Sequence, residues 1–255
     1  MNEQFVNEKG KEIEMENKEV KTARNEMMDR PVVKREIVDF LRKEQKPLSG
    51  KLGEIEREAN EKGVPIIPHE TVVFLSLLLG QIKPEQILEI GAAIGFSSSL
   101  MAQYVGESGH VTTIDRFDVM IEKARKNYEA LGLTDKVTLL EGQAADILPD
   151  LKGPYDFIFM DSAKSKYYDF FPECMRLLKV GGMLVVDDVL QGGTILLPKE
   201  DIPKRSRAIH RKLNLFLDVV MKHPALESSI VPLGDGLLMI VKKEEYDFSY
   251  LLEKE

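Results

Sequence analysis

Five short apolar runs, separated by segments with helical spacing, constrain the fold of this chain more than any other feature. The runs are residues 87–90, 111–114, 137–140, 157–160 and 183–186. Such alternation is typical of a parallel β-sheet with helices on both faces. Farther along, residues 229–233 and 237–241 flank Gly234-Asp235-Gly236, which predicts a hairpin that adds an antiparallel strand. We therefore expect an α/β fold with a seven-stranded, mostly parallel sheet.

Helical spacing also precedes the first strand. Two apolar stripes are evident, Val33, Ile37, Phe40 and Leu41, and then Leu52, Ile55 and Ala59. A third helix is expected from His69 to about Leu79, and its apolar run at residues 72–79 predicts a buried helix. Residues 1–28 are rich in Glu, Lys and Asn, so we expect them to be frayed or disordered. Residues 29–255 should form a single domain with a helical N-terminal extension.

Charge and composition argue against several classes of protein. A net charge of −8 disfavours an indiscriminate nucleic-acid binder, although it allows a local basic patch. No apolar run reaches the roughly 20 residues that span a bilayer, and no secretory signal is evident, so we expect a cytoplasmic protein without membrane contact. Cys174 lies in an amphipathic stretch, which favours core packing over catalysis. The histidines are scattered without ligand spacing, which argues against a zinc site.

Two glycines mark the point where the first strand gives way to a helix. Gly91 and Gly95 let the backbone pass close to a ligand, and Asp115 ends the next strand, where a carboxylate can accept hydrogen bonds from ribose hydroxyls. Together they predict a site for a nucleoside-containing cofactor, although the glycines alone would also suit close packing. A nicotinamide enzyme would have Gly-x-Gly-x-x-Gly, whereas Ala92 and Ala93 lie between these glycines. S-adenosylmethionine (SAM) carries no phosphate and does not need that turn.

Acidic residues follow two later strands. Asp161 comes after residues 157–160, and the pair Asp187-Asp188 comes after residues 183–186. Because parallel strands end at one edge of a sheet, we expect the three carboxylates to converge and bind a hard divalent cation such as Mg²⁺ or Mn²⁺. Helix capping is the alternative for these acids. Lys164 is close enough to Asp161 to approach a hydroxyl at that site, unless it is simply a solvated lysine.

Four motifs carry a family resemblance, over about residues 31–243. They are residues 64–67, residues 88–97, Asp161-Ser162-Ala163-Lys164, and residues 187–193. Their order and spacing resemble those of the cation-dependent class I O-methyltransferases, which include catechol and caffeoyl-coenzyme A methyltransferases. Within this family the chain is most similar to the bacterial branch that contains the tRNA 5-hydroxyuridine methyltransferase. The resemblance implies a Rossmann-like class I methyltransferase fold, and we further expect a homodimer.

The resemblance also implies roles for individual residues. The cofactor-binding set is Ile67, Glu89, Gly91, Ser97, Asp115, Gln143, Ala144 and Asp161, with SAM as cofactor. The metal-binding set is Asp161, Asp187 and Asp188, and Lys164 matches the family's proposed general base, which makes Lys164 and Asp161 the catalytic candidates. The chain departs from the family at Asp188, where many relatives have Asn. It departs again at Ala163, where catechol enzymes have an aromatic wall, and this argues against a catechol-sized acceptor.

The acceptor of the methyl group should carry two neighbouring oxygens, so that a cation can bind both. A basic stretch follows Gly192-Gly193 and contains Lys204, Arg205, Arg211 and Lys212. Residues seven apart share a helix face, so these side chains could hold the phosphates of a tRNA. We therefore place 5-hydroxyuridine in tRNA ahead of a small phenol. An ordinary solvated helix face, a coenzyme A thioester, and a SAM-binding protein without catalysis are the alternatives.

Overall fold

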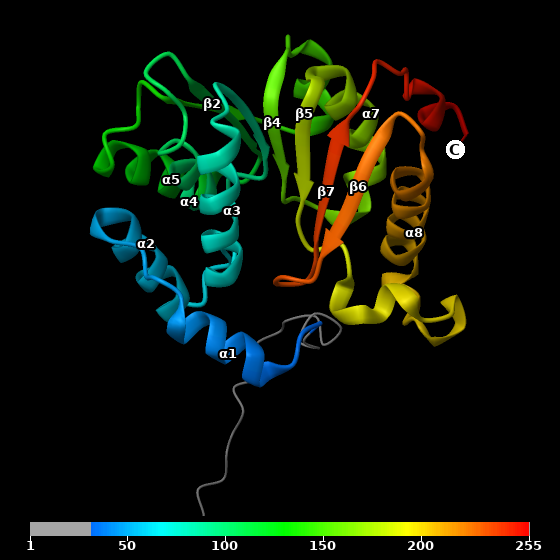
Figure 1. The fold of residues 1–255 in the computed structure, drawn as a ribbon, viewed down its shortest axis with the longest axis horizontal. Coiled ribbons are helices and arrows are strands. Elements are labelled where there is room, and N and C mark those ends of the chain that lie inside the picture. The colour runs from blue at the N-terminus through cyan, green and yellow to red at the C-terminus, as the bar shows by residue number, and fades with distance from the viewer. Residues whose placement is uncertain (1–31, 255) are drawn as a thin grey trace, which may run out of the picture.

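The structure, a computed structural model, describes residues 32–254 and contains one mixed β-sheet. Its seven strands lie in the order β3-β2-β1-β4-β5-β7-β6 (Figure 1). Only β7 runs antiparallel to its neighbours. The predicted seven-stranded, mostly parallel sheet with a C-terminal hairpin is therefore confirmed. The strands are β1 (Gln86–Ile90), β2 (His110–Asp115), β3 (Val137–Glu141), β4 (Tyr155–Met160), β5 (Leu178–Val186), β6 (Leu226–Val231) and β7 (Leu237–Lys242).

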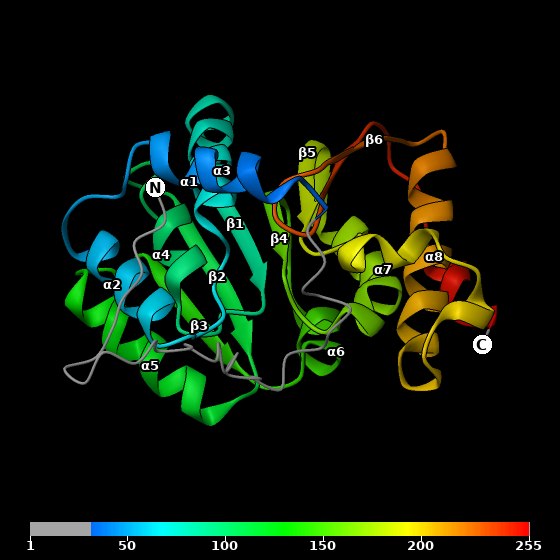
Figure 2. The same ribbon diagram turned by 90° about the horizontal axis from the view of Figure 1, so that it is seen from below.

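Helices cover both faces of this sheet, as Figure 2 shows from below. One face packs against α2, α3, α4 and α5, and the other packs against α7 and α8. None of the described helices is long and apolar enough to cross a membrane. The α-helices are α1 (Arg35–Glu44), α2 (Gly50–Glu61), α3 (His69–Ile82), α4 (Phe96–Met101), α5 (Asp118–Ala130), α6 (Ala144–Ile147), α7 (Tyr167–Leu177) and α8 (Arg207–Lys222).

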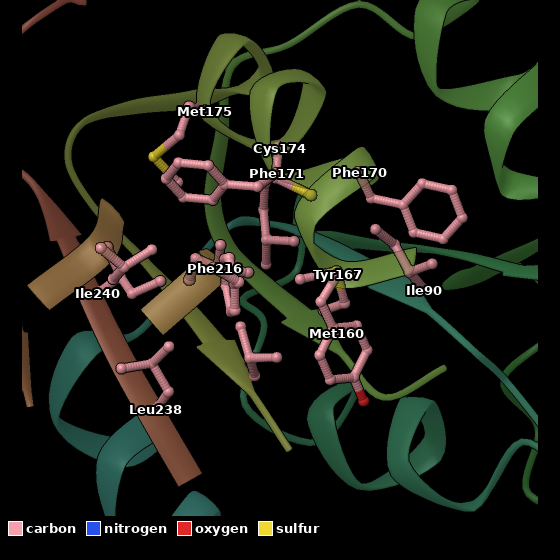
Figure 3. Close-up of a cluster of buried hydrophobic side chains, with 14 of the residues drawn as sticks. Ile90, Met160, Tyr167, Phe170, Phe171, Cys174, Met175, Phe216, Leu238 and Ile240 are labelled. Carbon is pink, nitrogen blue, oxygen red and sulfur yellow. The ribbon is translucent and has the colours of Figure 1, made fainter. Parts of the chain in front are cut away.

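Alternating side chains of the central strand divide the interior into two cores. On β4, Phe157 and Phe159 face α2 to α5, whereas Ile158 and Met160 face α7 and α8. The reason is the two-residue period of a strand. The second core is rich in aromatic rings: Phe171 lies edge-on to Phe216, with ring centroids 5.5 Å apart (Figure 3).

Cys174 belongs to the core beneath α7, as its spacing predicts. Burial raises the pKa of its thiol to about 12, so the thiolate form that would act as a nucleophile is strongly disfavoured. The structure thus assigns this residue to packing.

Burial of the N-terminal helices follows the apolar stripe in α2, where Leu52, Ile55 and Ala59 are buried, but not in α1 or on the outer side of α3. The run at residues 72–79 lies in α3, but only one side of that helix is covered, and Leu77 is 66% exposed. No residue of α1 is buried, and Ile37 and Phe40 lie exposed. The expectation of a buried third helix therefore holds only for the side with Val72, Leu75 and Leu79, because α3 packs between the sheet and solvent. The predicted frayed segment, residues 1–28, lies outside the described residues.

The strand order places a ligand site at one end of the sheet. The chain leaves β1 toward β2 on one side and later returns as β4 on the other side of β1. In such sheets ligands bind beyond the carboxyl ends of the strands where the order reverses. Figure 1 shows α1 and residues 191–206 at the end where β6 finishes and β7 begins.

Candidate active site

A cavity of about 490 Å³ lies at the carboxyl ends of β1, β2 and β4. It brings together residues that are far apart in the sequence, from Pro65 to Asp188. Glu89 and Lys164 do not line its wall, although both lie next to residues that do. The predicted site residues in the wall are Ile67, Gly91, Ser97, Asp115, Gln143, Ala144, Asp161, Asp187 and Asp188.

The loop between β1 and α4 needs both of its glycines. Gly91 has a φ of +107°, and a Cβ atom there would lie 1.9 Å from the backbone oxygen of Asp161. Gly95 has a φ of +73°, and its Cβ would lie 2.7 Å from the ring of Tyr128. Side chains larger than hydrogen would therefore push the loop away from β4 and α5. The glycines keep the loop backbone in the cavity wall.

Asp115 ties this loop to the start of α5. Its Oδ2 accepts a hydrogen bond from the backbone N–H of Ala93 at 2.8 Å. Its Oδ1 accepts from the N–H groups of Arg116 at 2.7 Å and Phe117 at 2.9 Å. The carboxylate thus shapes the cavity wall that it also lines.

Glu89 lies beneath the cavity wall and is completely buried. Its two carboxylate oxygens accept hydrogen bonds from the hydroxyls of Ser97 and Thr113. Burial raises the pKa of Glu89 to about 7, against the opposing effect of these hydroxyls. Glu89 thus orients the hydroxyl of Ser97, and Ser97 lines the cavity.

Three carboxylates meet where β4 and β5 end. Asp161 is partly exposed to the cavity, whereas Asp187 is only 3% exposed. Enclosure by the protein and the charge of Asp188 raise the pKa of Asp161 to about 7, and burial raises the pKa of Asp187 well above its usual range. Asp188 has a φ of +60°, a conformation that Asp and Asn tolerate better than most residues.

This acidic cluster has the oxygen ligands that a hard cation requires. As the side chains stand, no three Asp, Glu, His or Cys residues within 32–254 are grouped as a metal site. The ammonium of Lys164 lies among the acids instead, with its Nζ 2.8 Å from Asp188 Oδ2. Burial and the neighbouring carboxylates raise the pKa values of Asp161 and Asp187, and a positive charge beside them would favour their charged forms. The donor chemistry therefore fits a divalent cation.

Asp235 is a member of this cluster that the sequence did not reveal. Its Oδ2 lies 3.7 Å from the Nζ of Lys164, and burial raises the pKa of Asp235 to about 6. The sequence shows Asp235 only as the middle of Gly-Asp-Gly, which is also the usual signal of a hairpin turn. The turn itself is present between β6 and β7.

Comparison with known proteins agrees with this geometry. Residues 47–243 match the O-methyltransferase family. The chain belongs to this family. It is 35% identical to the catechol O-methyltransferase of Mycobacterium tuberculosis over 62% of this chain and 70% of the relative. It is 31% identical to the catechol O-methyltransferase of Niastella koreensis, over 74% of this chain and 82% of the relative. The Bacillus cereus O-methyltransferase, solved in complex with S-adenosylhomocysteine, shares the fold with a TM-score of 0.71, at 23% identity over 82% and 97% of the two chains.

In this O-methyltransferase the basic stretch is not one continuous helix. Lys204 and Arg205 lie in a separate 3₁₀ helix, η5 (Lys204–Ser206), and α8 begins only at Arg207. The prediction that residues seven apart share a helix face is wrong here, because η5 follows Pro203 with a different helical geometry. Lys212 pairs with Asp169 at 2.8 Å and is 15% exposed. None of Lys204, Arg205, Arg211 and Lys212 lines the cavity.

The raised pKa of Glu89 gives the O-methyltransferase a testable pH dependence. The folded protein holds a proton that the unfolded chain releases between about pH 4.5 and 7. This contribution is full below pH 4.5 and is lost as pH rises through 7, a change of about 3 kcal/mol. The side chain in Glu89→Gln is neutral at every pH, so it mimics the protonated form of Glu89 across the whole range. We expect urea unfolding to show a shallower fall in stability from pH 5 to pH 8 than in wild type.

Asp161 and Asp187 shift in the same direction, so part of the slope should remain in Glu89→Gln. Glu36→Gln on the exposed helix α1 is the control and should keep the wild-type slope. Equal slopes for Glu89→Gln and wild type would contradict the raised pKa.

Proposed function

We propose that this O-methyltransferase transfers a methyl group from SAM to the hydroxyl of a phenol that has a second oxygen next to it. One observation carries the proposal: a single cavity is lined both by the glycine loop with Asp115 and by the acids that end β4 and β5. The first group suits a nucleoside cofactor, and the second suits a cation that binds neighbouring oxygens. The names of the catechol enzymes among its relatives support this acceptor class.

The residues of the glycine loop would bind the donor. Gly91, Ser97 and Ile67 would surround the methionine part of SAM, because all three line the same wall. Asp115 would accept hydrogen bonds from the ribose while it holds the loop through Ala93. Gln143 and Ala144, at the start of α6, would lie against the adenine.

The acids would hold a divalent cation. Asp161, Asp187 and Asp188 are the residues that would coordinate it, and their oxygen-only chemistry fits Mg²⁺ or Mn²⁺. When bound, the cation would lower the pKa of the acceptor hydroxyl and bind its neighbouring oxygen. Binding would also separate Asp188 from Lys164, since Asp188 Oδ2 now accepts from the Lys164 ammonium.

The remaining residues would orient the acceptor and receive its proton. Methyl transfer from a sulfonium to oxygen is an in-line displacement, so positioning contributes most of the rate. Once the acceptor displaces it from Asp188, Lys164 would release its ammonium proton to water and then, as the neutral amine, accept the hydroxyl proton at Nζ. Ala163 lines the cavity and leaves room beside the ring, which suits a substituted phenol such as a hydroxycinnamoyl thioester better than bare catechol.

A second candidate acceptor is 5-hydroxyuridine in tRNA. It is supported by the exposed Lys204 and Arg205 in η5, and by the packing of α8 against the 3₁₀ helix η2 (Lys164–Lys166). Basic side chains near the lysine of the active site could bind phosphates. The pairing of Lys212 with Asp169 reduces the charge available there. We therefore place the substituted phenol first.

A methyl-transfer assay decides between the acceptors. The protein is incubated with methyl-labelled SAM and caffeoyl thioester, catechol, or hydroxyuridine-containing tRNA, with added Mg²⁺. We expect label in the two phenols, more in the thioester. Arg205→Glu should leave catechol methylation within about twofold, because Arg205 does not line the cavity and a charge outside it affects a small neutral acceptor little.

Label in tRNA alone would replace the phenol with the second candidate. In that case Arg205→Glu should weaken tRNA methylation, and more so at higher salt. Homodimerisation stays a prediction, supported by the exposed Ile37 and Phe40 on α1, and sedimentation would test it.

A further inference from the structure

The turn between β6 and β7 is held next to the candidate active site by backbone contacts. Leu190 donates its N–H to the carbonyl of Asp235 at 2.9 Å, and Val189 donates to the carbonyl of Gly236 at 3.1 Å. These residues directly follow the acids that end β5. A Cβ atom on Gly236 would lie 2.5 Å from the side chain of Leu190, so the two segments are in close contact. The turn therefore packs directly against the segment that follows Asp187 and Asp188.

The side chain of Asp235 has one fixed oxygen and one that faces Lys164. Its Oδ1 accepts a hydrogen bond from the backbone N–H of Gly192 at 2.5 Å, which fixes the orientation of the carboxylate. Its Oδ2 is buried and, among the described residues, has no hydrogen-bond donor. The Nζ of Lys164 lies 3.7 Å from this oxygen. A buried carboxylate oxygen without a hydrogen bond is costly unless a charge lies beside it.

Lys164 thus has two carboxylates within reach, and they differ in their surroundings. Asp188 lies 2.8 Å away and lines the cavity, whereas Asp235 lies 3.7 Å away and does not line it. A ligand in the cavity can compete with Lys164 for Asp188. It cannot compete for Asp235 in the same way, because Asp235 is behind the wall and only 12% exposed.

We propose that Asp235 is a positioning residue that holds the side-chain nitrogen of Lys164 beside the reacting oxygen when Asp188 is taken by a cavity ligand. This inference rests on the proposed function. The hydrogen bond from Gly192 orients the carboxylate of Asp235, and this carboxylate in turn orients Lys164. Asp235 would therefore act through the lysine and would not contact the substrate. Without it, Lys164 would lose one of the two carboxylates that face it and would compete more strongly for Asp188, a residue that would bind the cation.

The experiment is a double-mutant cycle of Asp235→Asn and Lys164→Met. Asn keeps an oxygen for the Gly192 N–H but removes the charge. We expect kcat to fall about 10- to 100-fold in Asp235→Asn, because a misplaced group costs that order in rate. The KM and the calorimetric affinity for SAM should stay within about twofold. In the Lys164→Met background, Asp235→Asn should lower kcat no further.

A readout that is independent of activity comes from urea unfolding of the same four proteins. If the charges interact, the midpoint shifts of the two single variants should not add in the double variant. Asp156→Asn is the matched control: Asp156 also accepts backbone hydrogen bonds and pairs with a lysine, Lys179, but it lies at the start of β4. It should leave kcat unchanged. Asp235→Glu restores the charge and should turn over faster than Asp235→Asn.

Three results would overturn the inference. Asp235→Asn could lower kcat as much without Lys164 as with it, its midpoint shift could add fully to that of Lys164→Met, or it could lose SAM affinity in proportion to kcat. Failure of the proposed function looks different: wild type would then methylate neither phenols nor tRNA. The unfolding cycle still decides whether Asp235 and Lys164 are coupled in that case.

Discussion

Gly91→Ala is expected to abolish SAM binding and to lower the free energy of unfolding by about 2–5 kcal/mol. The φ of Gly91 is +107°, and the added Cβ would lie 1.9 Å from the carbonyl oxygen of Asp161. That oxygen belongs to backbone at the end of β4, which cannot rotate away as a side chain could. The loop must shift, and it carries the wall on which SAM would lie. Urea unfolding and calorimetry with SAM measure the two effects.

Gly106→Ala is the matched control for this substitution. Gly106 does not have a positive φ, and a Cβ there would meet no atom within 4 Å. We expect its stability to stay within about 1 kcal/mol of wild type, with unchanged SAM affinity. A Gly91→Ala protein with wild-type midpoint and SAM affinity would show that the loop has more room than the structure gives it.

Removal of divalent cations is expected to lower methyl transfer by about a thousandfold or more, equivalent to about 4 kcal/mol of transition-state stabilisation. The reason is the pair Asp161 and Asp187: burial and the neighbouring carboxylates raise both pKa values, so a bound cation would favour their ionised forms. Activity should return with Mg²⁺ or Mn²⁺ after the chelator is removed. Asp161→Asn should lose activity to a similar extent while its unfolding midpoint stays near or above that of wild type.

Asp150→Asn serves as the control for charge removal, because Asp150 is exposed and lies outside the cavity. Its turnover should match wild type. Full activity of the wild-type protein after metal removal and in excess chelator would exclude a cation at Asp161, Asp187 and Asp188. The acids would then act with Lys164 alone.

The sheet could be predicted from the sequence because its parallel strands are buried on both faces. Runs such as residues 157–160 stay apolar throughout, since Phe157 and Ile158 face different cores and both must be covered. The position of the glycine loop followed from the same runs. Burial followed the apolar stripe in α2 but not in α1. An apolar stripe shows which face of a helix can be covered, but not how closely another element covers it.

The candidate site could be predicted where it depends on strand ends, and not where it depends on tertiary contacts. Asp161 and Asp188 follow strands that any parallel sheet brings together. The contact of Asp235 with Lys164 depends on the hairpin folding back beside the loop at residues 189–192, which no local pattern specifies. The pairing of Lys212 with Asp169 joins two helices in the same way. For Glu89, the sequence could not show that two hydroxyls enclose it beneath the cavity wall.

The two cores on opposite faces of the sheet bear on how acceptor specificity diverges in this family. The glycine loop rests on the core of α2 to α5, whereas η2 with Lys164 rests against α7 and α8 on the other core. Substitutions beneath α7 and α8 can therefore reshape the acceptor side without disturbing the packing that supports the donor loop.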